Sequence, residues 1–411
     1  MRRVVPSSLA ALSSHRETQA VGSRGRRTKV GSVDLRDTPD EASFRAELRA
    51  WLHENAPPLP HPERGSEEWQ PFHRAWHRKL FDAGYAGLSW PVAFGGRDGT
   101  PAQQVIFEEE LGRAGAPGLA NHLGVFHVAP AIMAYGTEDQ KLRFLPPILK
   151  AEEIWCQGFS EPGAGSDLAS LRTRAVRDGD DFVVNGQKVW TTFGRIADWC
   201  QLLVRTDPNA PKHRGISCLL VDMRSQGVAV RPLRQMTGQS EFGEVFFDDV
   251  RVPAENLLGE ENAGWQVTMT TLASERASVL TFHVRVRDEI ADLARLARER
   301  GRADDPIVRQ RIGACAIDAH LLRLFSYWTA TRAERRTATG LEGSLAKLLW
   351  SELEQRIGEA ATDMLGPGGA LDGPWVQKLL DSRSLTIAAG TSEIQRNLLA
   401  ERWLGMPRES R

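Results

Sequence analysis

The pattern of apolar and polar positions divides the chain into a helical part, a β-rich part and a second helical part. Phe44, Leu48 and Leu52 repeat every four residues, which places them on one face of a helix. Similar patterns predict further helices up to about Lys150. After Glu153 the helical period gives way to short β-rich runs separated by Gly, Pro and Asp.

The β-rich part is predicted to form an antiparallel barrel or sandwich. No helical pattern separates its strands, so a parallel sheet with crossover helices is disfavoured. Asn185-Gly186 is interpreted as a turn, with a strand on either side of it. The expected strands cover about 181–186, 188–192, 200–204, 215–221, 228–232 and 243–247.

The helical period returns at Gly264 and predicts a bundle of antiparallel helices. We expect one long helix from about Trp265 to Arg300. Asp305 before Pro306 is a typical N-cap and first helical position, and it predicts the start of the next helix. A third helix is predicted over about 342–365. Shorter helices are expected over about 375–388 and 392–403.

The predicted fold class is therefore α+β, in the order helical, β, helical. A chain of 411 residues with 41% hydrophobic content can form two or three domains. We place a disordered basic tail at 1–32, an N-terminal helical domain at 33–152, a β-domain at 153–258 and a C-terminal helical-bundle domain at 259–411. The tail has two alternative interpretations, a start codon assigned too early and a basic contact arm.

Charge and cysteine content exclude several classes of function. The net charge is −1, so no overall field attracts nucleic acid or a membrane surface. No apolar run approaches the ~20 residues of a membrane span. The cysteines are scattered, without metal-ligand spacing, and predict reduced, mostly buried thiols in a cytoplasmic protein with no metal site. They are Cys156, Cys200, Cys218 and Cys315.

Two segments carry candidate chemistry. The first is Gly158-Phe-Ser-Glu-Pro-Gly-Ala-Gly-Ser-Asp167, where small residues allow close approach to a planar ligand or a phosphate. By itself, Gly-Ala-Gly-Ser is more often an ordinary turn. The second is Lys188-Val-Trp-Thr-Thr192, where Trp190 can cover an aromatic ring and Thr192 can donate a hydrogen bond to a ring nitrogen. A lone Trp on a strand is more often part of the core.

Together these segments resemble the flavin site of the acyl-CoA dehydrogenase family. The resemblance extends over roughly residues 40–408 and includes Leu88–Pro91, Gly95-Gly96, Gly136–Gln140, Leu145-Pro146, Phe246–Pro253, Leu258-Gly259, Gly264-Trp265 and Gly390–Arg396. It implies an N-terminal helical domain, a β-domain and a C-terminal four-helix bundle. It also implies bound FAD, an acyl-CoA thioester as substrate, and an electron-transfer flavoprotein as electron acceptor.

The resemblance also assigns site residues. Phe159 and Ser160 should contact the flavin ring, Trp190 should cover it, and Thr192 should bond near its N5 atom. Thr391 and Glu393 should lie near the ribose and pyrophosphate. The full expected set for the cofactor is Phe159, Ser160, Gly165, Ser166, Trp190, Thr191, Thr192, Thr391 and Glu393, with Ser166 and Gly390 also at the substrate.

The catalytic base is the point at which this sequence differs from many relatives. They carry a glutamate directly before the Gly-Thr of the C-terminal signature, where this chain has Ala389. Some branched-chain and long-chain members carry the base on the first long C-terminal helix, just before an arginine. Glu275-Arg276 fits that second position, so Glu275 is the predicted base and Arg276 its catalytic neighbour. The alternative is a solvated Glu-Arg pair on a helix face.

In the predicted reaction Glu275 removes the α-proton, a hydride passes from the β-carbon to flavin N5, and a trans-2-enoyl-CoA results. Two departures from the family sequence concern how subunits assemble around the FAD. The Phe-Gly segment that reaches a neighbouring subunit's FAD is missing after Arg298, and Asp363 replaces a family glutamine. The pattern resembles the actinobacterial subgroup acting on bulky or steroid-derived acyl-CoAs.

We therefore expect either a homotetramer or an α2β2 heterotetramer with a paralogue. Two alternative functions stay open at this point. One is a flavin-dependent monooxygenase on the same fold, which dispenses with the base. The other is a non-catalytic partner subunit of a heteromeric dehydrogenase.

Overall fold

The computed structural model describes residues 36–63, 66–278, 282–371 and 373–408, apart from the side chains of 276–278. The predicted tail at 1–32 lies outside these residues. All four cysteines lie inside them and are buried and unpaired, as predicted. Within the same ranges, none of the helices combines the length and the apolar character needed to span a bilayer.

The N-terminal part is helical, as predicted, and its helices begin at clear capping signals. Thr38, Thr100 and Thr137 each accept a hydrogen bond from the backbone three residues on, and each forms a full capping box. The helices are α1 (Pro39–Asn55), α2 (Trp69–Asp82), α3 (Pro101–Arg113), α4 (Ala129–Tyr135) and α5 (Glu138–Leu149), with a π-helical turn, η2 (Gly124–Val128), before α4.

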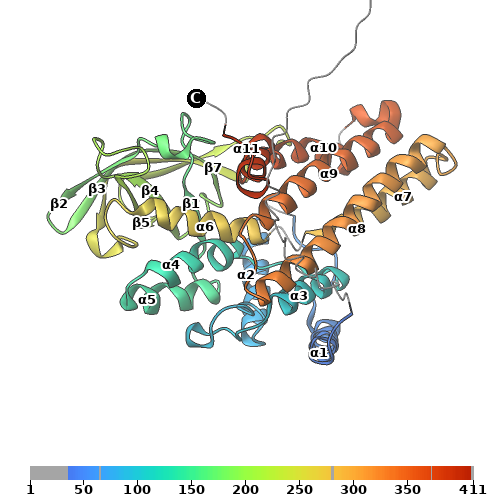
Figure 1. Cartoon of the computed structure of the whole chain (residues 1–411), viewed down its shortest axis with the longest axis horizontal. Helices are drawn as coiled ribbons and strands as arrows, with labels where there is room; N and C mark the ends of the chain where they lie inside the picture. The colour runs from blue at the N-terminus through green and yellow to red at the C-terminus, as the bar shows by residue number, and fades with distance from the viewer. Residues whose placement is uncertain (1–35, 64–65, 279–281, 372, 409–411) are drawn as a thin grey trace, which may run out of the picture. The chain divides into compact units, whose positions relative to one another are not determined.

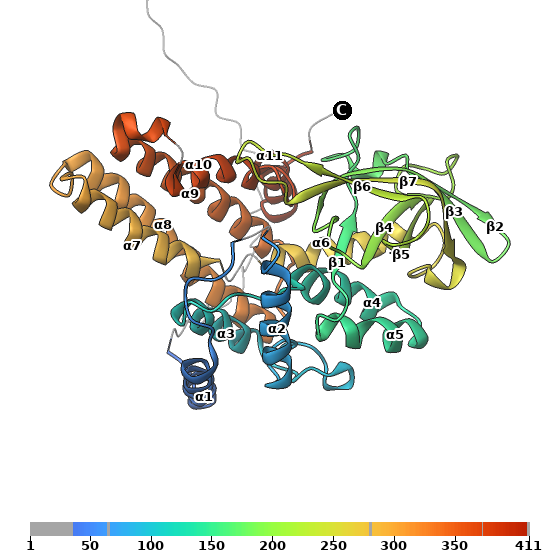
Figure 2. The same cartoon turned by 180° about the vertical axis from the view of Figure 1, so that it is seen from behind.

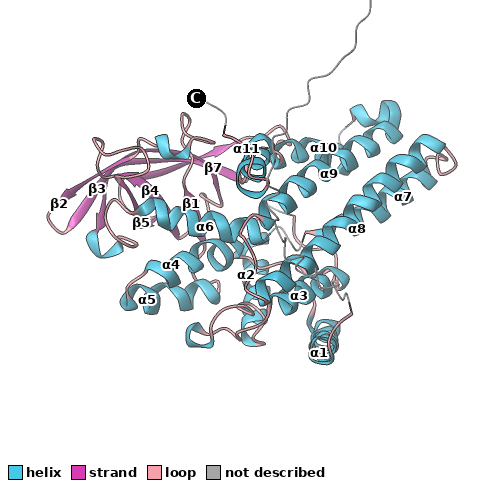
Figure 3. Ribbon diagram, in the orientation of Figure 1, coloured by secondary structure: helices cyan, strands magenta, loops and turns pink. Residues whose placement is uncertain are grey.

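The β-rich part forms one seven-stranded sheet, in the order β1-β4-β2-β3-β7-β6 with β5 paired to β4. Most pairs are antiparallel, as predicted, but β4 pairs in parallel with β1 and with β2. Figure 3 shows the strands gathered on one side of α6. The strands are β1 (Trp155–Gly158), β2 (Arg174–Asp178), β3 (Asp181–Thr192), β4 (Trp199–Arg205), β5 (Ile216–Asp222), β6 (Val228–Leu233) and β7 (Phe242–Pro253).

The predicted turn at Asn185-Gly186 is wrong, because both residues lie inside the continuous strand β3. The register against β7 shifts between Val184 and Gly186, so the strand has a bulge there. Gly186 has φ +151°, and an added Cβ would lie 2.6 Å from Thr173 Oγ1 and 2.7 Å from Thr173 Cα. Asn185 and Gly186 therefore form part of a β-bulge and of a close backbone approach. In the sequence, such a site shows the same Asn-Gly pattern as a turn.

Gly186→Ala is expected to destabilise the fold by about 1–3 kcal/mol, because the backbone of Thr173 cannot move aside as a flexible side chain would. Urea denaturation of the two proteins measures the difference. Gly118→Ala is the matched control, since its added Cβ meets nothing within 4 Å. Equal unfolding midpoints for Gly186→Ala and the unchanged protein would contradict the close approach.

The C-terminal part is helical, as predicted, but the expected single helix from Trp265 to Arg300 is wrong. α6 (Gly264–Ser278) and α7 (His283–Glu299) are separate helices. α6 packs against α4, β5 and α9, whereas α7 packs against α8 and α9. Residues 279–281, between the two helices, lie outside the described residues.

The remaining helices follow the predicted order. Asp305 accepts hydrogen bonds from the backbone of Ile307 and Val308, so the predicted N-cap is confirmed. These helices are α8 (Pro306–Glu334), α9 (Glu342–Leu365), α10 (Pro374–Leu385) and α11 (Ser392–Leu398). Figures 1 and 2 show α7, α8, α9 and α10 side by side, with α6 between them and the sheet.

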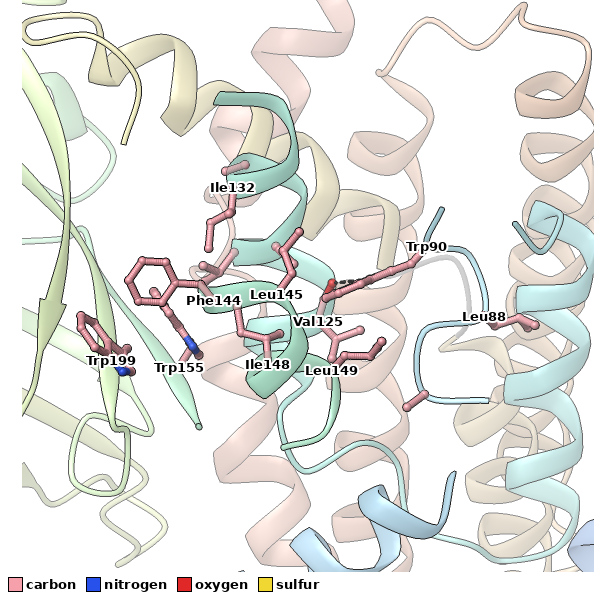
Figure 4. Packing of buried hydrophobic residues seen from close by; sticks show 14 of the residues in the cluster. Leu88, Trp90, Val125, Ile132, Phe144, Leu145, Ile148, Leu149, Trp155 and Trp199 are labelled. Atoms are coloured by element: carbon pink, nitrogen blue, oxygen red, sulfur yellow. Dashed lines mark hydrogen bonds between the residues drawn. The ribbon is translucent and has the colours of Figure 1, made fainter. Parts of the chain in front are cut away.

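The largest core cluster joins the N-terminal helices to one edge of the sheet. Trp155 of β1 and Trp199 of β4 stack with ring centroids 5.8 Å apart, and Phe144 of α5 meets both rings edge-on (Figure 4). Fully buried aromatic pairs of this kind fix the strands that carry them. β1 leads directly into the glycine-rich segment, so this packing sets the position of the candidate site.

Candidate active site

A buried ion pair holds the start of the glycine-rich segment. Lys188 Nζ on β3 donates to the carbonyl oxygen of Phe159 at 3.0 Å and to Glu161 Oε1 at 2.8 Å. Glu161 also accepts hydrogen bonds from the backbone N–H groups of Arg172 (2.7 Å) and Thr173 (2.8 Å). Both charged side chains are buried. The segment after β1 is therefore tied to β3 through side chains as well as backbone.

The electrostatics of this pair follow from burial and proximity. Burial tends to raise the pKa of Glu161, but the charge and hydrogen bond of Lys188 and the bonds from Thr173 outweigh it and lower the pKa. Burial lowers the pKa of Lys188, against the attraction of Glu161. A carboxylate and an ammonium at this depth are tolerated only because each is paired and hydrogen-bonded.

The predicted flavin segment at the end of β3 is irregular and partly open. Trp190 has φ +59° and its side chain is 60% exposed, and the register shifts between Lys188 and Thr191. The N–H of Val189 donates to the carbonyl oxygen of Ser160 at 2.9 Å. The structure thus brings Phe159 and Ser160 together with the Trp190 segment, as the sequence predicted.

These residues fit a planar cofactor with polar ring atoms. Thr191 Oγ1 is buried and has no hydrogen-bond partner among the described residues. An added Cβ at Gly163 or Gly165 would meet nothing within 4 Å, so the glycine-rich segment has room above it. The exposed indole ring can cover a flat ring system, and the buried hydroxyl without a partner can bond to a polar ring atom, so the two residues fit a flavin.

A second group of predicted residues lies around α6. Thr271, fully buried, exchanges hydrogen bonds with Gln201 of β4, with Gln201 Nε2 lying 3.0 Å from Thr271 Oγ1. Glu275 follows one helical turn later, so it lies on the same face of α6, and it is partly buried. The side chain of Arg276 lies outside the described residues. The predicted base therefore stands on the helix that joins the sheet to the bundle.

The segment 389–391 is fixed from two sides. Ala389 has φ +53° and Gly390 φ +87°. Gln395 Nε2 donates to the carbonyl oxygen of Ala389 at 2.7 Å, and Lys347 Nζ donates to that of Gly390 at 2.8 Å. Thr391 accepts a hydrogen bond from the backbone of Ile394 and so caps α11.

Lys347 bonds to this segment and is attracted by the charge of the predicted base. Its side chain on α9 is 1% exposed. Burial lowers its pKa to about 8, against the attraction of the carboxylates Glu352, Glu393 and Glu275. Lys347 thus contacts Gly390 directly, and the charges of Glu275 and Glu393 act on it from two other elements.

Sequence reasoning missed the residues that organise both groups. The motifs contain Lys188, Glu161 and Gln395 without marking them as organising residues, and Lys347 lies outside every motif. Its only local signal is a charged residue inside the apolar run Leu345-Ala-Lys-Leu-Leu349. Such a residue is usually explained by exposure, and only the structure shows that Lys347 is buried.

Two of the cavities are lined by C-terminal helices, the second together with Glu109 of α3. The larger, of about 310 Å³, is lined by Arg302, Arg311 and Asp363 among others. Arg311 contacts the Asp363 carboxylate, and Arg302 donates to the Asp363 carbonyl oxygen at 3.1 Å. No cluster of His, Cys, Asp and Glu suited to a metal ion occurs in the described ranges.

Known proteins resemble the chain over nearly its whole length. Family models described as acyl-CoA dehydrogenase N-terminal, middle and C-terminal domains match residues 38–152, 156–250 and 262–404. The "Acyl-CoA dehydrogenase IpdE1" of Mycobacterium tuberculosis (strain ATCC 25618 / H37Rv) is 42% identical over 386 residues, covering 90% of this chain and 99% of the relative.

Solved structures give the same result. The "Tcur3481-Tcur3483 steroid ACAD" has a TM-score of 0.81 at 33% identity, covering 92% of this chain and 100% of the solved chain. The ChsE4-ChsE5 complex from Mycobacterium tuberculosis has a TM-score of 0.79 at 34% identity, with the same coverage. Each of these two structures is named after two different proteins.

Proposed function

The chain belongs to the acyl-CoA dehydrogenase family, and from that membership we propose that it oxidises the α,β carbon–carbon bond of an acyl-CoA to the trans-2-enoyl-CoA with Glu275 as base. Family membership makes it an oxidoreductase acting on acyl-CoA. What we propose beyond family membership is which residue acts as the base and which residues bind FAD and the thioester.

The arrangement of Glu275, Lys347 and Gly390 carries this proposal. Many relatives have a glutamate where this chain has Ala389, and a methyl group cannot accept a proton. Lys347 bonds to the Gly390 carbonyl and is also attracted by Glu275. The attraction between Glu275 and Lys347, together with the bond from Lys347 to Gly390, supports a carboxylate from α6 in place of the one missing at Ala389.

We assign the remaining steps to residues of this chain. Glu275 takes the α-proton, and Gly390 and Ser166 lie along the thioester. Phe159, Ser160, Trp190, Thr191 and Thr192 would hold the FAD ring, with Thr391 and Glu393 toward its ribose and pyrophosphate. FAD, when bound, supplies the acceptor for the hydride that leaves the β-carbon. Loss of the proton from the α-carbon and of the hydride from the adjacent β-carbon yields the enoyl thioester.

A flavin-bleaching screen tests the proposal. The purified protein is mixed anaerobically with hexanoyl-CoA, isobutyryl-CoA, cyclohexane-1-carbonyl-CoA or a steroid-side-chain CoA thioester, and flavin absorbance and enoyl-CoA product are recorded. We expect bleaching and product with at least one thioester, and reoxidation by an electron-transfer flavoprotein. A flavin that is reduced only by an added reductase and then reacts with O2 would favour a monooxygenase and contradict the proposal.

We further propose that a paralogous chain completes the assembly and the FAD site. Two observations support this. Asp363 and its arginine neighbours bond to one another at the end of the bundle, where many relatives contact a neighbouring subunit's FAD. Two structurally similar assemblies carry the names of two different proteins, Tcur3481-Tcur3483 and ChsE4-ChsE5. Co-expression with a paralogous chain should raise the amount of flavin bound per protein. A fully flavinated homotetramer of this chain alone would exclude the need for a partner.

A further inference from the structure

Two polar side chains near the start of the glycine-rich segment have hydrogen-bonding atoms that the described part of the chain does not use. His127 lies in the π-helical turn η2 and is 5% exposed, and its Nδ1 is 3.4 Å from Oε1 of Gln157 on β1. His127 Nε2 and Gln157 Nε2 are buried, and neither has a hydrogen-bond partner among the described residues. Because buried polar atoms in native proteins are nearly always bonded, these two indicate a partner that the folded chain does not supply.

The alternation of side chains along β1 places Gln157 on the helix-covered face of the sheet. Trp155, two residues earlier, belongs to the core cluster shared with the N-terminal helices, whereas Cys156 belongs to a separate cluster formed by the strands. Gln157 pairs in parallel register with Gln201 of β4. The two amide side chains are therefore neighbours on the face that the helices cover.

α6 covers this face beside the pair. Gln201 Nε2 donates to Thr271 Oγ1 of α6 at 3.0 Å, and α6 also packs against η2 and α4 (Figure 1). Glu275 follows Thr271 by one helical turn, and Phe159 follows Gln157 by two residues. The pair thus borders both the helix of the proposed base and the strand that leads into the proposed flavin segment. An acyl group that reacts between that base and that flavin can extend to the pair.

The two unused atoms have complementary chemistry. Burial lowers the pKa of His127 to about 4, against its bond to Gln157, so the imidazole is neutral near neutral pH. Its Nδ1 donates to the Gln157 amide oxygen, which leaves Nε2 as an acceptor, while the Gln157 amide nitrogen is a donor. A hydroxyl can satisfy both atoms, since it donates one bond and accepts another. A carbonyl oxygen can satisfy only Gln157, and a hydrocarbon satisfies neither.

The neighbouring ring disfavours an anionic partner. His122 meets the ring of His127 edge-on, with the ring centroids 5.2 Å apart. Burial lowers the pKa of His122 to about 3, and the charge of His127 lowers it further. Both imidazoles are therefore neutral near neutral pH. A buried carboxylate or phosphate would need a cation to offset its loss of water, and these two rings provide none.

We propose that the acyl group oxidised by this chain carries a hydroxyl, on a carbon farther from the thioester than the β-carbon, and that this hydroxyl donates to His127 Nε2 and accepts from Gln157 Nε2. The inference rests on the proposed acyl-CoA dehydrogenation and narrows its substrate class. A buried water is the other partner with this chemistry, and it would give no preference among thioesters.

Matched thioesters test this substrate class. The flavin-loaded protein is given hexanoyl-CoA or 6-hydroxyhexanoyl-CoA, and cyclohexane-1-carbonyl-CoA or its 3- and 4-hydroxy derivatives, and kcat/KM is measured with an artificial one-electron acceptor. We expect at least one hydroxylated thioester to exceed its hydrocarbon counterpart about tenfold or more, because the counterpart leaves both polar atoms unpaired.

The outcomes separate this inference from the proposed function. Hydrocarbon thioesters that are oxidised as fast as every hydroxylated one would overturn the hydroxyl and favour water, while dehydrogenation itself would stand. Absence of flavin reduction with every thioester would refute the proposed function and this inference with it.

The double variant His127→Phe/Gln157→Met removes both unpartnered atoms together with the bond between the two side chains. Its ratio of hydroxylated to hydrocarbon kcat/KM should fall to about 1. Its ligand-free unfolding midpoint in urea should not fall, because the pair then contains no buried polar atom without a bond. A preference that persists in this variant would overturn the proposal. Should the double variant fail to fold, the ratio in Gln157→Met decides by itself.

His77→Phe is the matched control. This histidine is also buried, but both of its nitrogens have partners, the Leu149 carbonyl oxygen at 3.0 Å and the backbone N–H of Asn121 at 3.4 Å. The control variant should therefore unfold at lower urea concentration and keep the preference for the hydroxylated thioester. An equal loss of preference in His77→Phe would show that any damage to the helical core removes it, and would overturn the role of His127 and Gln157.

Discussion

Glu275→Gln is expected to lower the rate of acyl-CoA oxidation by about 10²- to 10⁴-fold while flavin remains bound. General base catalysis contributes on this order, and an amide of the same shape cannot accept the α-proton. Glu275 lies on α6, away from the ion pair that organises the Trp190 segment, so the flavin should bind as before. Both kcat and kcat/KM should fall, because the lost interaction acts in the transition state.

Stopped-flow reduction of the bound flavin by acyl-CoA measures the loss directly. Glu352→Gln is the matched control, since the charge of this carboxylate also acts on Lys347 but comes from α9, where it pairs with Arg396; it should change the rate only a few-fold. Near-normal reduction in Glu275→Gln would contradict the assignment. The double variant Glu275→Gln/Ala389→Glu carries its glutamate at residue 389 instead and should restore part of the rate. The left-handed conformation of residue 389 makes that variant less stable.

The order of the domains was predictable because periodicity reports which face of an element is buried. α9 and the N-cap Asp305 of α8 were predicted at the residues where they occur. The bulge at Gly186 and the separation of α6 from α7 were not, since both depend on tertiary neighbours. In α6 and α7 the helical pattern continues, while the partners of each helix differ.

The candidate site was predictable only as far as its motifs extend. Phe159, Ser160 and Trp190 were expected together because two motifs matched one family, and the structure brings them together. Lys188 and Lys347 escaped prediction, because a lysine in a sequence is normally solvated and nothing local marks these two as buried. Their importance lies in contacts between segments that are far apart, Lys188 with Glu161 and Lys347 with Gly390.

Lys188→Met is expected to destabilise the protein by about 3–5 kcal/mol and to weaken flavin binding. Removing one partner of a buried ion pair leaves an uncompensated charge, and Glu161 is only 9% exposed. The Phe159 carbonyl loses its Lys188 donor at the same time. Glu161→Gln/Lys188→Met should recover part of the stability, because the neutral amide needs no counter-charge. Arg251→Met, which breaks exposed ion pairs with Asp178 and Asp181, should cost far less, because surface pairs contribute little to stability.

The pH dependence of this loss of stability tests whether it comes from the charge of Lys188. In the unchanged protein the pKa of Glu161 lies below its ordinary value of 4.5, so the pair contributes stability above that value and loses it as pH falls toward the folded pKa. In Lys188→Met burial acts on Glu161 without a cation, which raises its pKa, so protonation relieves the defect as pH falls. Urea unfolding at neutral pH and near pH 4.5 should therefore show the difference between the two proteins shrinking in acid. A difference that stays constant, or grows, would mean that Lys188 acts through packing and not through its charge.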